Sequence, residues 1–279
     1  MARQPPGEPP PPAVQKLRLR YTKLGRLRFT SHRDIARAFE RALRRAQVPM
    51  AYSAGFSPHP KISWVGAAPT GVASEAEYVE ISLAVRVDPD ALRRALDDSL
   101  PAGIDIVDVV EAQPGTSLPD RVQASAWTIR LPGVTALEAG PAVAEFMARE
   151  VVEVSRLMKD GRRTFDARGP VASLRASTDP ADDRCAILEL VVRHVTPAVR
   201  PDDILTALRL VADLAPPEPY QGTRRAQGLL TADGKVDDPL APDRIAAGPG
   251  LPGAGSMSTG VTRQVDEAVG VKLEASVAD

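Results

Sequence analysis

Between residues 16 and 112, the hydrophobic period of the sequence changes from two to about 3.6 and back again. Leu17, Leu19 and Tyr21 alternate with basic residues, which is typical of a strand, and the apolar spacing that follows predicts a helix ending before Pro49. Further strands are predicted at residues 27–29, 50–53, 61–65, 78–87 and 104–110, with a second helix at 90–100. The order is β-α-β-β-α-β, the connectivity of a ferredoxin-like domain.

A second pattern of the same kind follows a Pro- and Gly-containing linker at residues 112–122. Strands are predicted at residues 125–131, 152–159, 163–166, 171–176 and 184–194, and helices at 135–150 and 201–214. We therefore predict an α+β protein with two tandem ferredoxin-like (βαββαβ) domains, at residues 16–112 and 123–238. A single larger α+β domain that shares one sheet is the alternative.

The two ends of the chain have a different composition. Residues 1–15 are rich in proline, and residues 239–279 are rich in Gly, Ala and Pro, without an aromatic residue. Such segments bury little apolar surface. We predict a disordered tail at each end.

Several classes of function are disfavoured by what the sequence lacks. Cys185 is the only cysteine, so the chain alone cannot form an intramolecular disulfide or a cysteine-ligated iron–sulfur cluster. His32, His59 and His194 have no metal-ligand spacing, and we predict neither a metal nor a cofactor. The first residues lack the apolar core of a secretion signal, and no apolar run reaches the length of about 18 residues that indicates a membrane helix. We therefore expect a cytoplasmic protein that does not contact a membrane.

Positive charge is concentrated in residues 16–45, which hold eleven Lys or Arg and two acids although the whole chain has a net charge of −1. Such a segment is either a solvated basic face or the binding surface for an anionic partner, with RNA phosphates as the obvious candidate. The candidate RNA- or phosphate-binding residues are Arg18, Arg20, Arg26, Arg28, His32, Arg33, Arg37, Arg41, Arg44, Arg45 and Lys61.

Within this segment, Ser31 and Asp34 mark the start of the first helix. Ser31 is a plausible N-cap, with Asp34 three residues later. A helix N-terminus next to His32 and Arg33 attracts anions. A phosphate-binding corner and ordinary capping without a ligand are both open here.

The stretch at residues 52–61, Tyr-Ser-Ala-Gly-Phe-Ser-Pro-His-Pro-Lys, combines aromatic and imidazole side chains with residues that stiffen a loop. Phe56 could stack on an unpaired base, or it could belong to the core of a rigid connecting loop. The acids Glu75 and Glu77 can hold a metal or do acid–base work, but an ion pair with the helix arginines is favoured. The residues of this candidate ligand or partner site are Tyr52, Ser53, Gly55, Phe56, Pro58, His59, Glu75 and Glu77.

These same motifs resemble the radical-SAM-associated, or radical-SAM-linked, proteins, a family of unknown function. The resemblance lies in residues 26–34, 39–45, 49–61, 69–71 and 74–78, and it continues more loosely to about residue 230, including residues 223–225. It implies an association, since family members are fused to or encoded beside radical-SAM proteins with a cobalamin-binding-type domain, and near genes for ribonuclease E/G and ribosomal proteins. No catalytic roles come with the family. The three-cysteine motif of radical-SAM enzymes is absent, so iron–sulfur chemistry would belong to a partner.

Three hypotheses for function follow. The favoured one is a non-catalytic accessory protein of a radical-SAM enzyme, which binds RNA during rRNA or tRNA modification or in ribosome-related metabolism. The second is a metal-independent RNA endonuclease in which His32 or His59 is the general acid or base. The third is a protein-interaction module whose acidic residues between 66 and 120 contact a basic partner.

Overall fold

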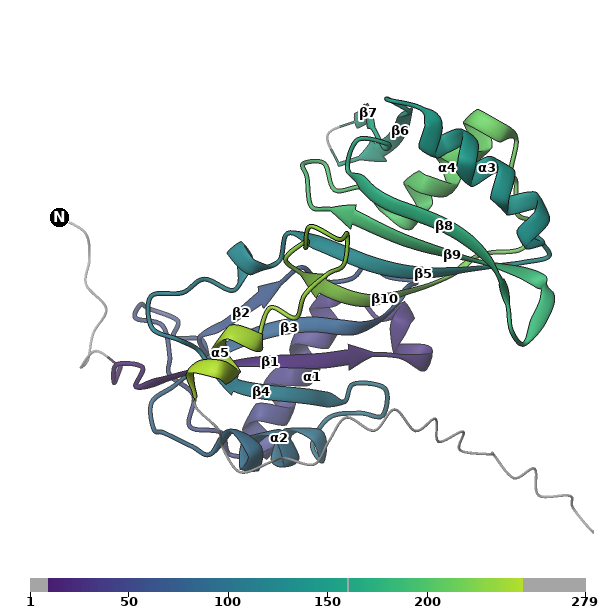
Figure 1. The fold of residues 1–279 in the computed structure, drawn as a ribbon. Helices are drawn as coiled ribbons and strands as arrows, with labels where there is room; N and C mark the ends of the chain where they lie inside the picture. Colours follow the sequence, from purple (N-terminus) through teal and green to yellow (C-terminus); the bar gives the residue numbers. More distant parts are fainter. Residues whose placement is uncertain (1–9, 160, 248–279) are drawn as a thin grey trace, which may run out of the picture. The chain divides into compact units, whose positions relative to one another are not determined.

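The computed structural model describes residues 10–159 and 161–247 of the 279-residue chain. The described residues form a mixed α+β structure in which one large sheet carries helices (Figure 1). The elements of the first half are β1 (Gln15–Lys23), η1 (Gly25–Phe29, a 3₁₀ helix), α1 (His32–Arg45), β2 (Ile62–Val65), β3 (Ala73–Leu83), α2 (Pro89–Asp97) and β4 (Ile106–Glu111).

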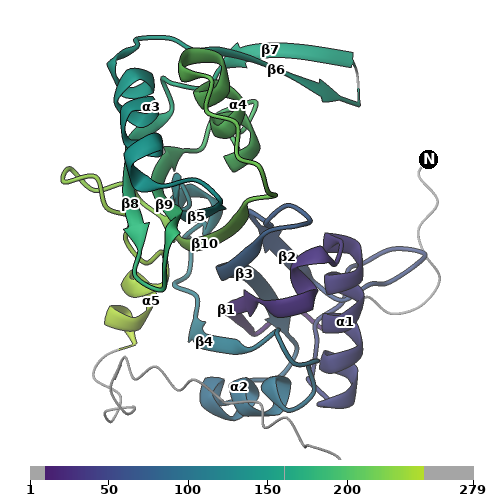
Figure 2. The same ribbon diagram turned by 90° about the vertical axis from the view of Figure 1, so that its right-hand side faces the viewer.

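The strands of the first half are all antiparallel, in the order β4-β1-β3, and β2 pairs with the C-terminal part of β3. The apolar side chains Leu17 and Leu19 of β1 pack on the same face as Val79 of β3. The helices α1 and α2 cover this face with Phe39 and Leu96 among others (Figure 2). The alternation seen in the sequence therefore marks the core face correctly.

The first helix begins where its capping residue predicts. Ser31 has extended backbone geometry, and its Oγ accepts a hydrogen bond from the backbone N–H of Asp34. The predicted extended segment at residues 27–29 was wrong, because Gly25, with a φ of 54°, instead opens the 3₁₀ turn η1.

The second half contains η2 (Pro119–Arg121, 3₁₀), β5 (Ala124–Pro132), α3 (Ala136–Ala148), β6 (Glu153–Met158), β7 (Gly161–Asp166), β8 (Val171–Asp179), β9 (Asp182–Arg193), α4 (Pro201–Ala212), β10 (Gln221–Gly228) and α5 (Ala241–Ala246). The antiparallel order of its main strands is β10-β5-β9-β8. The strands β6 and β7 form a separate two-stranded sheet. A core of mostly aliphatic side chains, with Trp127 and Phe146, fills the space beneath α3 and α4.

The strand β10 joins the two halves. It pairs antiparallel with β5 and, over Thr223 and Arg224, parallel with Ala73 and Ser74 of β3. The result is one continuous sheet in the order β4-β1-β3-β10-β5-β9-β8, so the strands of the two halves share a sheet.

The predicted C-terminal tail begins too early. Residues 239–247 are ordered, since α5 lies against the sheet face opposite α1 (Figure 1), and Leu240 and Asp243 are buried there. The Gly-, Ala- and Pro-rich composition did not indicate that the apolar side chain of Leu240 and the charged side chain of Asp243 would hold this segment on the sheet. The remainder of that tail prediction, residues 248–279, and most of the N-terminal one, residues 1–9, lie outside the described residues.

No helix in residues 10–159 and 161–247 is long and apolar enough to cross a membrane.

Candidate nucleic-acid interface

Arg18 does not belong to the interface that the sequence predicted. Its side chain is 0% exposed, with Nε donating to Glu80 at 2.7 Å and Nη1 donating to Asp243 at 2.8 Å. Its Nη2 donates to the backbone carbonyl of Thr116 at 2.8 Å. The prediction was wrong because α5 covers the polar face of β1, which the alternation alone assigns to solvent.

Three other predicted cations make a hydrogen bond or an ion pair within the protein. Arg20 is half-buried and donates from Nε to the carbonyl of Glu75 at 3.0 Å, and Arg45 donates to the carbonyl of Ser99 at 3.2 Å. Arg37 makes an exposed pair with Asp34 at 3.4 Å, a geometry worth little energy. These contacts leave Arg37 and Arg45 at the surface and tie Arg20 to the sheet.

The remaining cations make no side-chain hydrogen bond or ion pair with any described residue. On α1, the residues Arg33, Arg37, Arg41 and Arg44 are spaced four, four and three positions apart, so they follow one side of the helix. This row, called the arginine stripe below, is roughly 16 Å long at about 1.5 Å of rise per residue. The apolar face of α1 is turned to the sheet. Within the stripe only Arg37 has such a contact, its exposed pair with Asp34. The other predicted cations without one are Arg26, Arg28 and Lys61.

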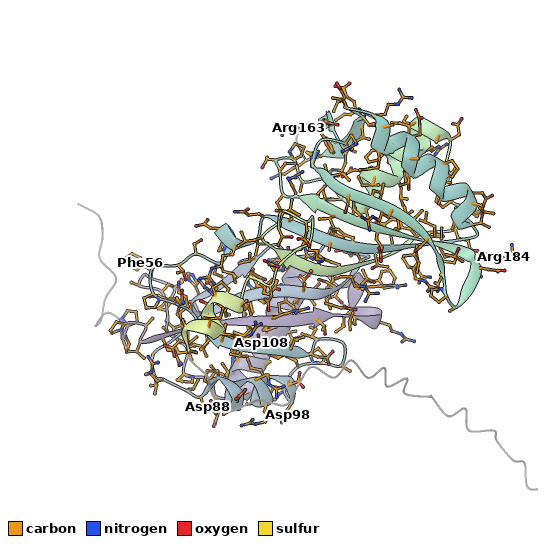
Figure 3. The ribbon with its side chains drawn as sticks, viewed as in Figure 1. Phe56, Asp88, Asp98, Asp108, Arg163 and Arg184 are labelled. Carbon is orange, nitrogen blue, oxygen red and sulfur yellow. The ribbon has the colours of Figure 1, made fainter. Side chains whose placement is uncertain are left out.

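The loop at residues 52–61 is closed at its base and carries Phe56 at its tip. The backbone N–H of Ser53 donates to the carbonyl of His59 at 2.9 Å, and Ser53 Oγ lies 2.8 Å from Nδ1 of His59. Gly55 has a φ of 145°, which favours glycine at this turn. Phe56 is 64% exposed, so it is not part of the core (Figure 3). Pro58 is exposed as well.

A hollow of about 470 Å³ connects the arginine stripe with this loop. It is lined by Glu40 and Arg44 of α1 and by Tyr52, which is 43% exposed, and Pro60 of the loop. At the opposite end of α1, the Arg28 guanidinium is 4.7 Å from the ring centroid of Phe29, which is 60% exposed. Cations thus stand beside exposed aromatic rings at both ends of the helix, the combination that grips single-stranded nucleic acid.

The two histidines proposed as acid and base have unrelated surroundings. His32 is exposed at the start of α1, with its ring edge-on to Trp64 at 5.1 Å between centroids, whereas His59 contacts Ser53 and Ser57. No described hydrogen bond brings them together. The helix N-terminus beside His32 already holds a carboxylate, because Asp34 accepts from Ser31 Oγ at 2.7 Å. Ordinary capping accounts for this corner.

Glu75 and Glu77 form ion pairs, but not with the helix arginines that the sequence suggested. Glu75 pairs with Arg225 at the surface, and Glu77 pairs with Arg224 in the interior. Glu77 also accepts from the backbone N–H of Ala68 at 3.0 Å. Both arginines belong to β10, and their positions at residues 224 and 225 were visible only as part of the family motif.

Lys23 is a buried cation that no sequence motif singled out. Its ammonium donates to the carbonyls of Ala68 and Pro69 at 3.3 and 2.9 Å. Burial lowers the pKa of Lys23, the charge of Glu77 opposes that shift, and Arg224 adds to it. Lys23, Glu77 and Arg224 therefore form a buried charge cluster where β10 joins β3.

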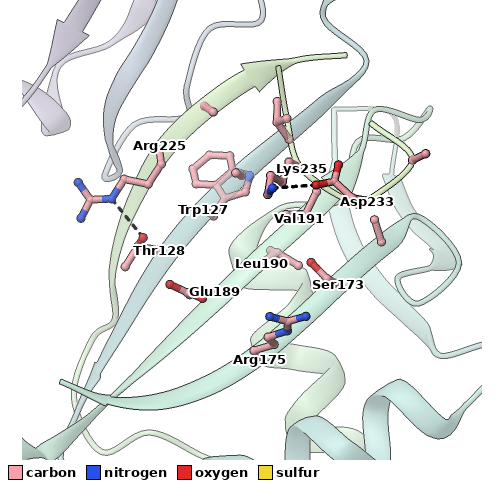
Figure 4. A pocket seen from close by; sticks show the side chains of 16 residues that line it. Trp127, Thr128, Ser173, Arg175, Glu189, Leu190, Val191, Arg225, Asp233 and Lys235 are labelled. Carbon is pink, nitrogen blue, oxygen red and sulfur yellow. Dashed lines mark hydrogen bonds and ion pairs between the residues drawn. The ribbon is translucent and has the colours of Figure 1, made fainter. Parts of the chain in front are cut away.

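A larger groove of about 770 Å³ lies on the second half, along β5, β8 and β9 (Figure 4). Arg225 reaches Thr128 Oγ1 at 3.1 Å there, and Lys235 pairs with Asp233 at 2.8 Å. Glu189 also lines it. Because its acids and bases are interspersed, the groove has less attraction for a polyanion than the arginine stripe.

Comparison with known proteins identifies a family for this chain but does not assign it an activity. No curated protein matches the sequence. A DyP-type peroxidase from Mycobacterium smegmatis, solved by cryo-electron microscopy in its encapsulated form, is 11% identical over 81% of this chain and 94% of its own, with a TM-score of 0.18. A likeness at that level supports no inference about fold or function. The model of a family described as uncharacterized protein conserved in bacteria (DUF2344) matches residues 16–201, and the chain belongs to this family.

Proposed function

We propose that this protein is a non-catalytic, RNA-binding accessory of a radical-SAM enzyme, and that the arginine stripe with the loop at residues 52–61 is its RNA-binding surface. The observation that carries the proposal is the shared hollow between Arg44 and Tyr52. Unpaired arginines attract the phosphate backbone, while an exposed ring beside them offers a platform for a base.

The accessory role rests on the sequence resemblance and on the chemistry of the chain. A radical-SAM enzyme needs several cysteine thiolates for its iron–sulfur cluster. This chain has one cysteine, and Cys185 is buried in β9. An accessory would present RNA to the enzyme that carries the cluster.

We also propose that each half is a ferredoxin-like unit. The support is the connectivity: β1-α1-β2-β3-α2-β4 in the first half, and β5-α3-β8-β9-α4-β10 with the β6–β7 hairpin inserted in the second. In this description, the pairing of β10 with β3 joins two units edge to edge.

The proposal is tested by affinity purification of the tagged full-length protein from its native cells, with half of the material treated with nuclease. We expect a radical-SAM protein in both halves and a defined RNA only in the untreated half. The same purification with Arg33, Arg41 and Arg44 changed to Glu should retain the protein partner and lose the RNA. Recovery of neither a radical-SAM protein nor a defined RNA would contradict the proposal.

The RNA recovered in this purification also distinguishes an RNA endonuclease from a non-catalytic RNA-binding protein. Incubation of the recovered RNA with the purified protein in EDTA should leave the RNA intact. Cleavage that disappears with His32→Ala or His59→Ala would replace the accessory role with a catalytic one.

A further inference from the structure

A second site lies away from the arginine stripe, where the two halves of the chain meet. A cavity of about 290 Å³ is bounded by the segment after β2, by β5 and β10, and by the segment that leads into α4. Ligand sites prefer such junctions. The residues that line it include Ala67, Ser125, Trp127, His194, Arg200 and Arg224.

The polar lining of this cavity is rich in hydrogen-bond donors. Arg200 and Arg224 are both lining residues, and no Asp or Glu is. Arg224 uses Nε for Ser74 Oγ at 3.3 Å and Nη2 for Glu77, while its Nη1 has no hydrogen bond to any described residue. Arg200 is exposed and forms no ion pair within residues 10–159 and 161–247. Guanidinium donors are suited to carboxylate and phosphate oxygens.

The hydrogen bonds of His194 define which of its nitrogens carries the proton. Its Nδ1 lies 3.0 Å from the carbonyl oxygen of Val122, which can only accept, so Nδ1 is protonated. In the neutral ring Nε2 therefore accepts from Ser125 Oγ at 2.7 Å. Partial desolvation of the imidazole lowers the pKa of His194, a backbone hydrogen bond to Val122 opposes that shift, and the charge of Arg224 adds to it. Protonation would reverse the Ser125 bond and release the serine O–H to another acceptor.

Two lining residues also hold buried polar atoms without a partner. Nε1 of Trp127 and Oε1 of Gln227 have no hydrogen bond to any described residue. Buried polar groups usually find a partner, and exceptions occur at functional sites. The indole of Trp127 is also 5.5 Å from the Arg224 guanidinium, which places a flat apolar wall beside the cation.

We infer that this junction cavity binds a small molecule with one carboxylate or phosphate group on a mostly apolar body. The oxyanion would lie between Arg200 and Arg224 near Ser125, and the body against Trp127, Val192 and Val199. A volume of about 290 Å³ fits a small metabolite. This site is independent of the proposed RNA surface, because it shares no residue with the arginine stripe or the loop.

The test uses the full-length protein with Trp64→Phe, which leaves Trp127 as its only tryptophan. The fluorescence of Trp127 is followed while the protein is titrated with benzoate, which carries a carboxylate, or with inorganic phosphate. We expect a saturable change with at least one probe, weakened about tenfold by Arg200→Ala, the effect of losing one charge-assisted hydrogen bond. The matched control is Arg209→Ala, an exposed arginine of α4 that does not line the cavity.

Two additional readouts separate binding from misfolding. Ala67→Leu, which narrows the cavity without removing a charge, should weaken the same probe while the far-UV circular dichroism stays unchanged. Benzoate should bind more tightly at pH 6 than at pH 8, because an anion beside His194, Arg200 and Arg224 favours the protonated imidazole, and His194→Gln should abolish that difference. Absence of a saturable change with both probes, or equal affinity in the Arg200→Ala and Arg209→Ala proteins, would overturn the inference.

Discussion

Arg224 of β10 and Glu77 of β3 form an ion pair in the interior, although 147 residues separate them in the sequence. Their side chains are 5% and 3% exposed, whereas the adjacent pair of Arg225 and Glu75 is 49% and 37% exposed. The two pairs fasten the same strand to β3, one in the core and one at the surface. Comparing the stability lost when each pair is removed therefore shows how burial changes the contribution of an ion pair.

Loss of the buried pair should destabilise the whole sheet. Arg224→Ala leaves Glu77 charged in the interior, and we expect a loss of about 3–5 kcal/mol in the free energy of unfolding by urea. Arg225→Ala removes the same charge one residue later and should cost at most about 1 kcal/mol. Similar losses for the two variants would show that Glu77 is solvated and that the junction is not closed as described.

The C-terminal helix α5 should be required for the stability of the first half. Asp243 accepts from Arg18 and from Arg121 at 2.8 Å each, and its side chain is 0% exposed. Truncation after residue 239 removes this partner from two arginines and should lower the free energy of unfolding by about 3–5 kcal/mol. Truncation after residue 247, which keeps α5, is the control; if the two truncated proteins were equally stable, α5 would not stabilise the first half.

The same carboxylate predicts a pH dependence. Burial raises the pKa of Asp243, but hydrogen bonds from Arg18, Gln113 and Arg121 outweigh it, and the pKa is lowered from its usual value of 3.8. A lowered pKa in the folded state stabilises the protein above pH 3.8, and that stability is lost as the pH falls below it. The stability difference between the wild type and Asp243→Asn, measured by urea unfolding, should therefore shrink between pH 5 and pH 3. A difference that stayed constant over this range would contradict the assignment.

The sequence predicted where helices begin better than it predicted long-range contacts. Ser31 and Asp34 predict the start of α1, and Pro201 predicts the start of α4, because capping and proline geometry depend on neighbours in the chain. Arg18 was misplaced because its partner Asp243 lies 225 residues away. Alternation in a strand indicates two faces, but it does not show which later segment covers one of them.

Similar limits applied to the candidate site. The arginine stripe follows from helical spacing, and the exposure of Phe56 agrees with one of the two interpretations of its loop. The sequence did not predict the polar lining of the 290 Å³ cavity. Ser125, His194 and Arg224 come from separate strands or their ends, and no regular sequence spacing links them. The pairing of β5 with β9 brings Ser125 and His194 together, and the pairing of β10 with β5 adds Arg224.

The exposed aromatic rings should contribute to RNA affinity without contributing to stability. Phe56→Ala is expected to weaken binding of a single-stranded RNA by about 1–3 kcal/mol, the cost of one lost stacking contact. Its effect on unfolding should stay within about 0.5 kcal/mol, as for other surface changes. Leu137→Ala, at an 88% exposed position of α3, is the matched control and should leave RNA affinity unchanged. Unaltered affinity in Phe56→Ala would remove this ring from the interface.

The central claim, that the arginine stripe binds RNA phosphates, is tested most directly by the salt dependence of RNA affinity. The wild type is compared with Arg33→Ala/Arg41→Ala/Arg44→Ala and with Arg163→Ala/Arg184→Ala/Arg209→Ala. The second variant is a control that removes three exposed arginines of the second half, two of which, Arg163 and Arg184, are labelled in Figure 3. Each single-strand phosphate contact contributes about 0.7 to the slope of log affinity against log salt, so the stripe variant should lose about two units of slope and the control none. Equal slopes for the stripe variant and the wild type would contradict the account.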